Sequence, residues 1–577
     1  MAFSRKPLAA VMVTALAGAL AACGGGGSGD SGSGAKAEKG GDAVFFIGKR
    51  NVEHWDPQRM YIGRDLNNSG RLFYRGLVAY PASNDPKEGT TPVADLATDT
   101  GTTPDGGKTW KFTVRDDVKW EDGKAITCED FAYGASRNFA TDVIIGGPAN
   151  YVFTYFDIPT DTDGTPKYKG PYTKVGQDLF DQAVSCDGQT ITYKMKKAWP
   201  DFPQSIASLR YLDPYRADLD KGDANNFKVI SNGPYKLEGD WKEGTGGKFV
   251  RNENWDASTD PIRKAYPDTW DFREGDTDET IYEQLLNDSG DAQYAVTERR
   301  IPPALFGRKD EAGDRYTQVE SPYVDYVVPN FKSKVFSDAN CREALKLATN
   351  REAWIKAGGG DQFYKPADSI VNPGVPGYQP NPAFKDLPAA GDIDGAKAAL
   401  AKCSAPKPVK IKFTYNGGSP TSDNQASALK ESWDAAGFQT ELDPQVDTYY
   451  SIIQKPGATF DVTWGGWGAD WPSVGTVIPP LFDSRINLTK SSNGNDYGQY
   501  AGGAEVDKMI DDAYAESDLD AAADKWAAVD AKLGEDVAYI PLEITIFNFV
   551  HGGKVTGYVN NVAVNGYADL AVVGVQK

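Results

Sequence analysis

One acid, Asp470, lies among tryptophans and glycines in residues 460–480, FDVTWGGWGADWPSVGTVIPP. Glycines permit a bend or a close approach of the backbone to a ligand, and tryptophans supply large apolar faces with a polar N–H edge. An acid in these surroundings is a candidate for binding a cationic group of a small molecule. The structural alternative is a core strand over 460–464 and a tight loop in which Asp470 caps a turn. The candidate ligand-binding residues are Trp464, Gly466, Trp467, Asp470 and Trp471.

The sequence offers no recognisable catalytic set. The chain has two histidines, His54 and His551, and it contains no G-x-S-x-G elbow, phosphate-binding loop or H-E-x-x-H helix. A Cys/His zinc site is not expected, because the five cysteines form no C-x-x-C pair. A carboxylate pair for glycoside hydrolysis stays open among 81 acidic residues, but no spacing singles one out. We therefore expect binding without catalysis, no cofactor and no bound metal, with an extracellular hydrolase as the alternative.

Length and composition describe a protein of several domains. At 577 residues the chain exceeds the ~250–300 residues that one hydrophobic core serves. Aromatic residues make up 12% of the chain, more than a core needs, which favours a site that encloses or stacks on a ligand. The net charge of −20 argues against nucleic acid as a partner, because nucleic-acid binders carry a basic surface.

The N-terminal residues have the features of an export signal. Two basic residues precede an apolar run over 8–20, whose length is typical of a signal peptide and short of the ~20 residues that span a bilayer. The run ends in LAAC at 20–23, which resembles the bacterial lipobox, where cleavage leaves Cys23 N-terminal and lipid-modified. Residues 24–42 are rich in Gly and Ser and predict a flexible tether. We expect a body anchored at the extracellular face of the cytoplasmic membrane; a secretory signal with an incidental Cys23 is the alternative.

Residue patterns predict regular elements in the first half of the chain. Residues 44–48, VFFIG, form a short apolar run typical of a strand. Residues 109–115, TWKFTVR, alternate between polar and apolar as a strand does. Thr127 is placed to cap a helix that carries Glu129 and Asp130 in its first turn.

Residue spacing and turn formers predict elements in the second half of the chain and two less regular segments. Segments 504–517 and 519–536 have apolar residues at helical spacing, which indicates two helices that cover a core. Residues 140–180 are rich in turn formers and predict a surface excursion, and the Pro- and Gly-rich residues 353–390 predict a long loop.

Eight motifs follow one another from residue 92 towards the C-terminus. They are the stretch 92–133, NGPY at 232–235, RNENW at 251–255, GDAQYA at 290–295, NCREALKLATNREAW at 340–354, DIDGAKAALAKC at 392–403, GFQTEL at 437–442 and VAYIPL at 537–542. In content and order they resemble the extracellular solute-binding proteins of family 5, the oligopeptide-, dipeptide- and nickel-binding receptors of ABC importers. Asn232 stands where the family usually has glycine.

This resemblance implies an α/β fold of two lobes, the periplasmic-binding-protein fold of type II, with an additional inserted domain and a hinge-bending cleft. The apolar-aromatic runs 319–331 and 539–549 would be the strands that cross between lobes. The resemblance also implies a division of the chain, with 1–22 as signal peptide and 23–42 as lipid-anchored tether. Domain I is then discontinuous and consists of 43–78, 206–318 and 545–577, whereas 79–205 form domain II and 319–544 form domain III.

Four cysteines remain for the folded body, and four cysteines allow three pairings. We favour Cys128–Cys186 and Cys341–Cys403, because each pair then lies within one implied domain. Buried free thiols are the alternative.

The resemblance also implies a role for Asp470. In oligopeptide- and dipeptide-binding relatives, a G-w-x-x-D motif supplies an aspartate that pairs with the α-ammonium group of the peptide, and residues 466–470 match it. Opposite charges ~4 Å apart attract by about 4 kcal/mol at an effective dielectric of ~20. We expect the turn after the strand to present Asp470 to the cleft, and Trp464 to belong to the core. No basic residue stands out as a partner for a ligand carboxylate; the arginines of helix 340–354 are expected to be structural.

The function implied is that of a monomeric, lipid-anchored receptor that delivers oligopeptides to an ABC permease. The alternative within the same fold is an oligosaccharide, with the tryptophans as stacking platforms, or a metal chelate.

Overall fold

The computed structural model describes residues 37–577 except 50, 84, 163, 447, 458 and 489–491. The predicted signal segment 1–22, the lipidation site Cys23 and most of the tether lie outside the described residues. Strand β1 begins at Asp42, one residue before the predicted start of the folded body. The Gly40 amide already donates a hydrogen bond to the Tyr266 carbonyl (2.8 Å), so the last residues of the predicted tether pack on the body.

A five-stranded mixed sheet is built from the N-terminal portion of the chain. β1 is parallel to both of its neighbours, whereas β8 is antiparallel to its own. The predicted run VFFIG is buried throughout, as expected of a central strand covered on both faces. The strand order is β10 (Ala295–Thr297), β1 (Asp42–Gly48), β9 (Thr269–Glu274), β8 (Gly246–Arg251) and β7 (Tyr235–Lys242).

A three-stranded antiparallel sheet follows, with the predicted strand at β4. Helix α3 begins after Thr127, and the Thr127 and Asp130 side chains form a capping box, as the sequence predicts. The elements are β4 (Thr109–Thr113), β6 (Thr190–Lys194) and β5 (Val184–Asp187), with α3 (Cys128–Arg137), α4 (Ala149–Tyr155), α5 (Gln177–Ala183) and α6 (Phe202–Ser208).

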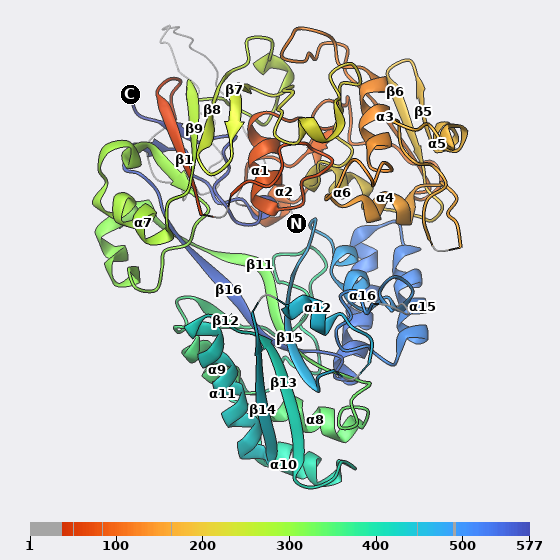
Figure 1. Ribbon diagram of the computed structural model, residues 1–577, viewed down its shortest axis with the longest axis vertical. Coiled ribbons are helices and arrows are strands. Elements are labelled where there is room, and N and C mark those ends of the chain that lie inside the picture. The colour runs from red at the N-terminus through yellow and green to blue at the C-terminus, as the bar shows by residue number, and fades with distance from the viewer. Residues whose placement is uncertain are drawn as a thin grey trace, which may run out of the picture. The chain divides into compact units, whose positions relative to one another are not determined.

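A six-stranded sheet contains both long apolar-aromatic runs. They form β11 (Tyr316–Pro329) and β16 (Ile540–Val550), which pair antiparallel over nearly their whole length and lie side by side in Figure 1. The order is β12 (Tyr364–Pro366), β16, β11, β15 (Val462–Gly468), β13 (Val409–Asn416) and β14 (Phe438–Gln445). The prediction of two long strands is therefore confirmed, and their role as hinges stays a prediction.

The two faces of this sheet carry separate cores. Successive side chains of a strand point to opposite faces, so Val327 and Trp464 pack with one group of helices, and Tyr326 and Trp467 with another. Figure 1 shows α9, α10 and α11 beside β13 and β14. The first group is α8 (Ala339–Ala348), α9 (Arg351–Ala357), α10 (Ile393–Lys402) and α11 (Pro420–Ala436); the second includes α12 (Tyr449–Ile453), α13 (Ile478–Phe482), α15 (Gly503–Tyr514) and α16 (Leu519–Glu535).

The predicted helices 504–517 and 519–536 are confirmed as α15 and α16. The prediction of a surface excursion over 140–180 is wrong for α4, because Tyr151, Val152 and Tyr155 are buried there. The remaining elements of the described residues are α1 (Gly63–Leu72), β2 (Val78–Ala79), α2 (Pro86–Gly89), β3 (Val93–Ala94), α7 (Asp278–Asn287), α14 (Ser484–Asn487), β17 (Val555–Thr556), β18 (Gly574–Val575) and six 3₁₀ segments.

Both favoured disulfides are present, Cys128–Cys186 and Cys341–Cys403. Within the described residues, one group of His, Cys, Asp or Glu side chains has metal-ligand spacing, Asp338 with Cys341 and Cys403. Its two cysteines are bonded to each other and offer no thiolate to a metal. No helix in the described portion of the chain is both long and apolar enough to cross a bilayer.

Candidate ligand-binding site

Strand β15 leads directly to the candidate residues. It begins at Val462 and continues through the glycines to Gly468, so the prediction that the strand ends at 464 is wrong. The reason lies in the neighbouring strand β11. A Cβ at Gly466 would overlap the Asp325 carboxylate, and a Cβ at Gly468 would overlap the Tyr323 ring. These two glycines are required for close packing between strands, and neither has a positive φ.

Asp470 follows β15 by two residues and contacts segments from distant regions of the chain. The hydroxyl groups of Tyr61 (2.8 Å) and Tyr151 donate to the same carboxylate oxygen, Oδ2. The Asp470 amide donates to Thr476 Oγ1 (3.3 Å), which fixes the turn. A carboxylate offers about four lone-pair directions, so Oδ1 retains capacity for a further donor.

The electrostatic state of Asp470 reflects this environment. Burial raises the pKa of its carboxyl group above the ordinary value, and the hydroxyl groups of Tyr151 and Tyr61 oppose that rise. No arginine or lysine forms a salt bridge with Asp470 among the described residues. A charged ligand group would supply the neutralisation that the protein does not.

The three candidate tryptophans have different surroundings. Trp464 packs edge-on against Trp354, with ring centroids 4.9 Å apart, and belongs to the core as predicted. The Trp467 indole donates to the Thr476 carbonyl (3.0 Å) and lies against the opposite core. Trp471 is 1% exposed, and its indole donates to Asp201 (2.7 Å). Its ring also packs on Tyr151 of α4, with centroids 4.9 Å apart. Trp471 therefore connects the loop after β15 with α4 and with the segment that leads into α6.

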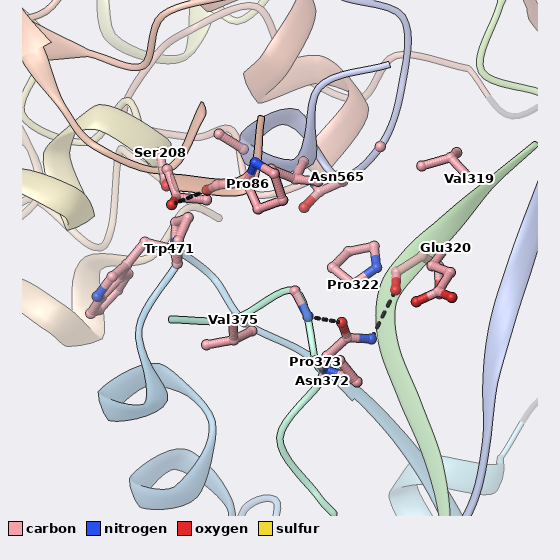
Figure 2. A pocket seen from close by; sticks show the side chains of 18 of the residues that line it. Pro86, Ser208, Val319, Glu320, Pro322, Asn372, Pro373, Val375, Trp471 and Asn565 are labelled. Atoms are coloured by element: carbon pink, nitrogen blue, oxygen red, sulfur yellow. Dashed lines mark hydrogen bonds between the residues drawn. The ribbon is translucent and has the colours of Figure 1, made fainter. Parts of the chain in front are cut away.

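A cavity of about 300 Å³ opens beside Asp470 (Figure 2). Its walls include residues 319–322 of β11, the loop 372–375, residues 469–472, and Val562, Ala563, Asn565 and Gly566, with mostly apolar side chains. Figure 2 shows Asn372 holding the loop against β11, where its amide donates to the Ser321 carbonyl (2.9 Å). The Trp471 indole points away from Pro322 in the same view.

A second cavity, of about 530 Å³, is more polar. Tyr61, Tyr323, Asp325 and Gly466 contribute to its lining, together with arginines and acids. Because Tyr61 lines this cavity and Asp470 lines the first, the hydrogen bond between them joins the walls of both. Of the predicted site residues, Asp470 and Trp471 therefore line one cavity and Gly466 the other.

Sequence reasoning missed Tyr61 and Tyr151. They lie 409 and 319 residues from Asp470. The sequence carried one relevant signal, the excess of aromatic residues, but it does not say which of them meet at the cleft.

Comparisons with known proteins agree with this geometry. Residues 91–488 match the model of the bacterial extracellular solute-binding proteins, family 5, middle region. The chain is 25% identical over 480 residues to the periplasmic oligopeptide-binding protein OppA of Haemophilus influenzae (79% of this chain, 80% of the relative). It is 24% identical over 522 residues to OppA of Bacillus subtilis (86% and 87%). Among solved structures, clavulanic acid biosynthesis oligopeptide binding protein 2 superposes with a TM-score of 0.84 at 25% identity (94% and 96%).

The fold is thus the two-lobed α/β architecture of periplasmic peptide-binding proteins, as predicted. The chain belongs to family 5 of the bacterial extracellular solute-binding proteins. It is accordingly a binding protein of a transport system and not an enzyme, which confirms the prediction of binding without catalysis.

Proposed function

We propose that this protein is a membrane-anchored receptor that captures oligopeptides outside the cell and delivers them to an ABC permease. The LAAC sequence at 20–23 and the Gly/Ser-rich residues after it support the anchor. Relatives named as oligopeptide-binding proteins, which align with four-fifths or more of their length, support the ligand class. Domains I, II and III divide as the family pattern implies, and β11 and β16 act as the hinge between them.

One observation carries the peptide assignment. Asp470 is an enclosed carboxylate that lines one cavity and is joined to the other through Tyr61. Among the described residues it accepts from hydroxyl groups, and its Oδ1 has capacity for a further donor. The α-ammonium group of a peptide supplies both the charge and the N–H donors that such a carboxylate lacks. Binding at the terminus does not depend on the peptide's sequence, which suits a receptor for many peptides.

Two measurements test the proposal. Native mass spectrometry of the protein purified from its own host is expected to show a set of bound peptides, and a bound saccharide or metal chelate without peptide would contradict it. In calorimetry, Asp470→Ala is expected to weaken peptide binding by about 2–5 kcal/mol, the usual loss when one partner of a buried charge pair is removed. Unchanged affinity would remove Asp470 from the site.

An oligosaccharide ligand is the alternative, and the tryptophans give it limited support. Stacking needs an exposed indole face, yet Trp471 is buried and Trp464 packs in the core. Trp467 is half-buried and is the remaining candidate. Binding of cello- or xylo-oligosaccharides that is lost in Trp467→Ala but kept in Asp470→Ala would favour the saccharide.

A further inference from the structure

One face of the six-stranded sheet carries two carboxyl groups side by side, of which Asp325 lines the polar cavity and Glu543 is buried next to it. Asp325 of β11 and Glu543 of β16 are directly opposed in the antiparallel register. Directly opposed residues point to the same face of a sheet, and Asp325 lines the cavity. Thr545, two residues beyond Glu543, lines it too, so this face of β16 is turned towards the cavity.

Among the described residues, no basic side chain is paired closely with either carboxyl group; the charge of Arg300 acts on both from a longer distance and opposes the rise in their pKa. No lysine or arginine forms a salt bridge with Asp325 or Glu543 in the described portion of the chain. Glu543 is 1% exposed, and its Oε2 accepts no hydrogen bond from an N–H or hydroxyl group there. Burial, and then the charge of Asp325, raise the pKa of Glu543 well above its ordinary value.

The other charged side chains of the cavity are already engaged. Arg64 binds Asp65 (2.6 Å) and Glu298 (3.3 Å), and Arg299 binds Asp278 (2.6 Å). The exception is Arg300, which is exposed and makes no salt bridge among the described residues; its guanidinium lies 5.1 Å from the centre of the Phe547 ring. The carboxyl pair and Arg300 thus remain as the charges of this cavity that a ligand can engage.

The cavity beside Asp325 is lined in part by exposed tyrosines. Gly466 is opposite Asp325 on β15, and its missing side chain leaves the carboxylate room. Tyr61 and Tyr323 line the same cavity and are 43% and 37% exposed. Tyrosine rings attract cations through their faces, so both the acids and the rings favour a positive group.

We propose that Asp325 and Glu543 form a subsite that binds the guanidinium or ammonium group of a basic side chain of the ligand. This inference rests on the peptide-receptor function and adds a preference for peptides that contain arginine or lysine. The Tyr61–Asp470 hydrogen bond places the subsite next to the position proposed for the α-ammonium group. A planar guanidinium can donate to both carboxylates at once, so arginine is favoured over lysine.

The test is a calorimetric comparison of matched peptides. Tri- to pentapeptides with arginine at one position are compared with the same peptides carrying citrulline, which keeps the shape and loses the charge. We expect the arginine peptide to bind at least tenfold more tightly at one or more positions. The ratio of the two dissociation constants, citrulline peptide over arginine peptide, is expected to fall to within threefold of one in Asp325→Asn and in Glu543→Gln. The affinity for the citrulline peptide is expected to stay almost unchanged. Retention of the ratio in both variants, or a ratio of one in the unmodified protein, would overturn the subsite.

Two controls separate the subsite from other effects. Glu441→Gln removes one negative charge from β14, at the edge of the sheet and away from the subsite. It is expected to keep the ratio, because the preference for arginine comes from the subsite and not from the net charge of the protein. Arg300→Gln is expected to keep or increase the ratio, because it removes a competing cation; loss of the ratio there would contradict the proposal.

Failure of the subsite and failure of the receptor function are distinguishable. If peptides bind through Asp470 with no preference for arginine, the receptor function stands and the subsite is refuted. If no peptide binds at all, both are refuted. Thermal unfolding of each variant shows whether a change in affinity comes with a change in folding.

Discussion

Two groups of buried acids in this protein differ in what neutralises them. In the first half of the chain, Asp95 and Asp260 are held by Arg75 and Arg263, with nitrogen–oxygen distances of 2.7–3.4 Å. Beside the first cavity, Asp470 is held by tyrosine hydroxyls and, in the described portion of the chain, by no lysine or arginine. The first group of acids is neutralised by arginines of the protein itself, whereas the second leaves a carboxyl group that the proposed function assigns to a cationic ligand.

The pKa directions follow this difference. Burial alone would raise the pKa of Asp260, but the charges of Arg263 and Arg75 outweigh it and lower that pKa to about 2. At Asp470, where hydroxyls are the donors, burial outweighs them and the pKa is raised. An arginine partner therefore identifies an acid that serves the structure. A buried acid without an arginine is a candidate for binding, particularly where it lines a cavity.

The largest expected effect is on stability, in the arginine-held group. Arg263→Met leaves two buried carboxylates undercompensated and removes hydrogen bonds to the Gly70 carbonyl (2.9 and 2.7 Å). We expect a loss of about 3–5 kcal/mol in the free energy of unfolding, measured by urea denaturation. Peptide affinity is expected to stay unchanged, because none of these residues lines either cavity.

Arg273→Met is the matched control. Arg273 pairs with Asp271 and Asp291 at the surface of β9, where the expected loss is about 0–1 kcal/mol. Equal losses in the two variants would show that burial of the network contributes nothing.

Asp470→Asn is expected to reduce peptide affinity without a loss of stability, the reverse of Arg263→Met. The amide keeps the size of the side chain and removes the charge, so peptide affinity is expected to fall by about 2–5 kcal/mol in calorimetry. The stability of the unliganded protein is expected to stay equal or to rise, because a charge that is costly to bury is gone. A large loss of stability with unchanged affinity would place Asp470 in the same class as Asp95.

The same contrast predicts opposite effects of pH on stability. Asp530 accepts hydrogen bonds from Tyr539 (2.6 Å) and Ser369 (2.9 Å), and burial raises its pKa to about 6. Between pH ~4 and 6 the folded protein retains this proton more than the unfolded chain does, so the Asp530 contribution decreases as pH rises. Asp260, with its pKa lowered to about 2, contributes stability above pH ~4 and loses it as pH falls towards 2.

Urea denaturation of variants at several pH values checks these signs. As pH rises from ~4 to 6, the free energy of unfolding of Asp530→Asn is expected to increase by on the order of 2 kcal/mol relative to that of the unmodified protein. As pH rises from ~2 to 4, the free energy of unfolding of Asp260→Asn is expected to decrease by a comparable amount relative to that of the unmodified protein. A difference that does not vary with pH in either variant would contradict its assignment.

Local patterns predicted much of the fold, because the information they use is local. The cap at Thr127 and the apolar spacing over 504–536 depend on residues within one or two turns. Residue types singled out Asp470, and resemblance to the family predicted the two long strands and the α-ammonium partner of Asp470. The end of β15 was missed because the need for Gly466 comes from Asp325, 141 positions earlier, across a strand pairing that no local pattern records. The Tyr61 and Tyr151 partners and the Asp325–Glu543 register could not be predicted for the same reason.

The smallest expected effect concerns one hydroxyl at the cleft. Tyr61→Phe removes one of the two donors to Asp470 Oδ2 and leaves Tyr151 in place. The carboxylate keeps its charge, so the attraction for an ammonium group remains, and peptide affinity is expected to change by about 0.5–1 kcal/mol, or two- to fivefold. Tyr172→Phe is the control, because Tyr172 is also exposed and donates to Asp220 (2.8 Å), which lines neither of the two cavities. It is expected to leave affinity unchanged. If Tyr61→Phe reduced affinity as much as Asp470→Asn, the ligand would be bound through the tyrosine hydroxyl, and the proposed ammonium–carboxylate contact would be wrong.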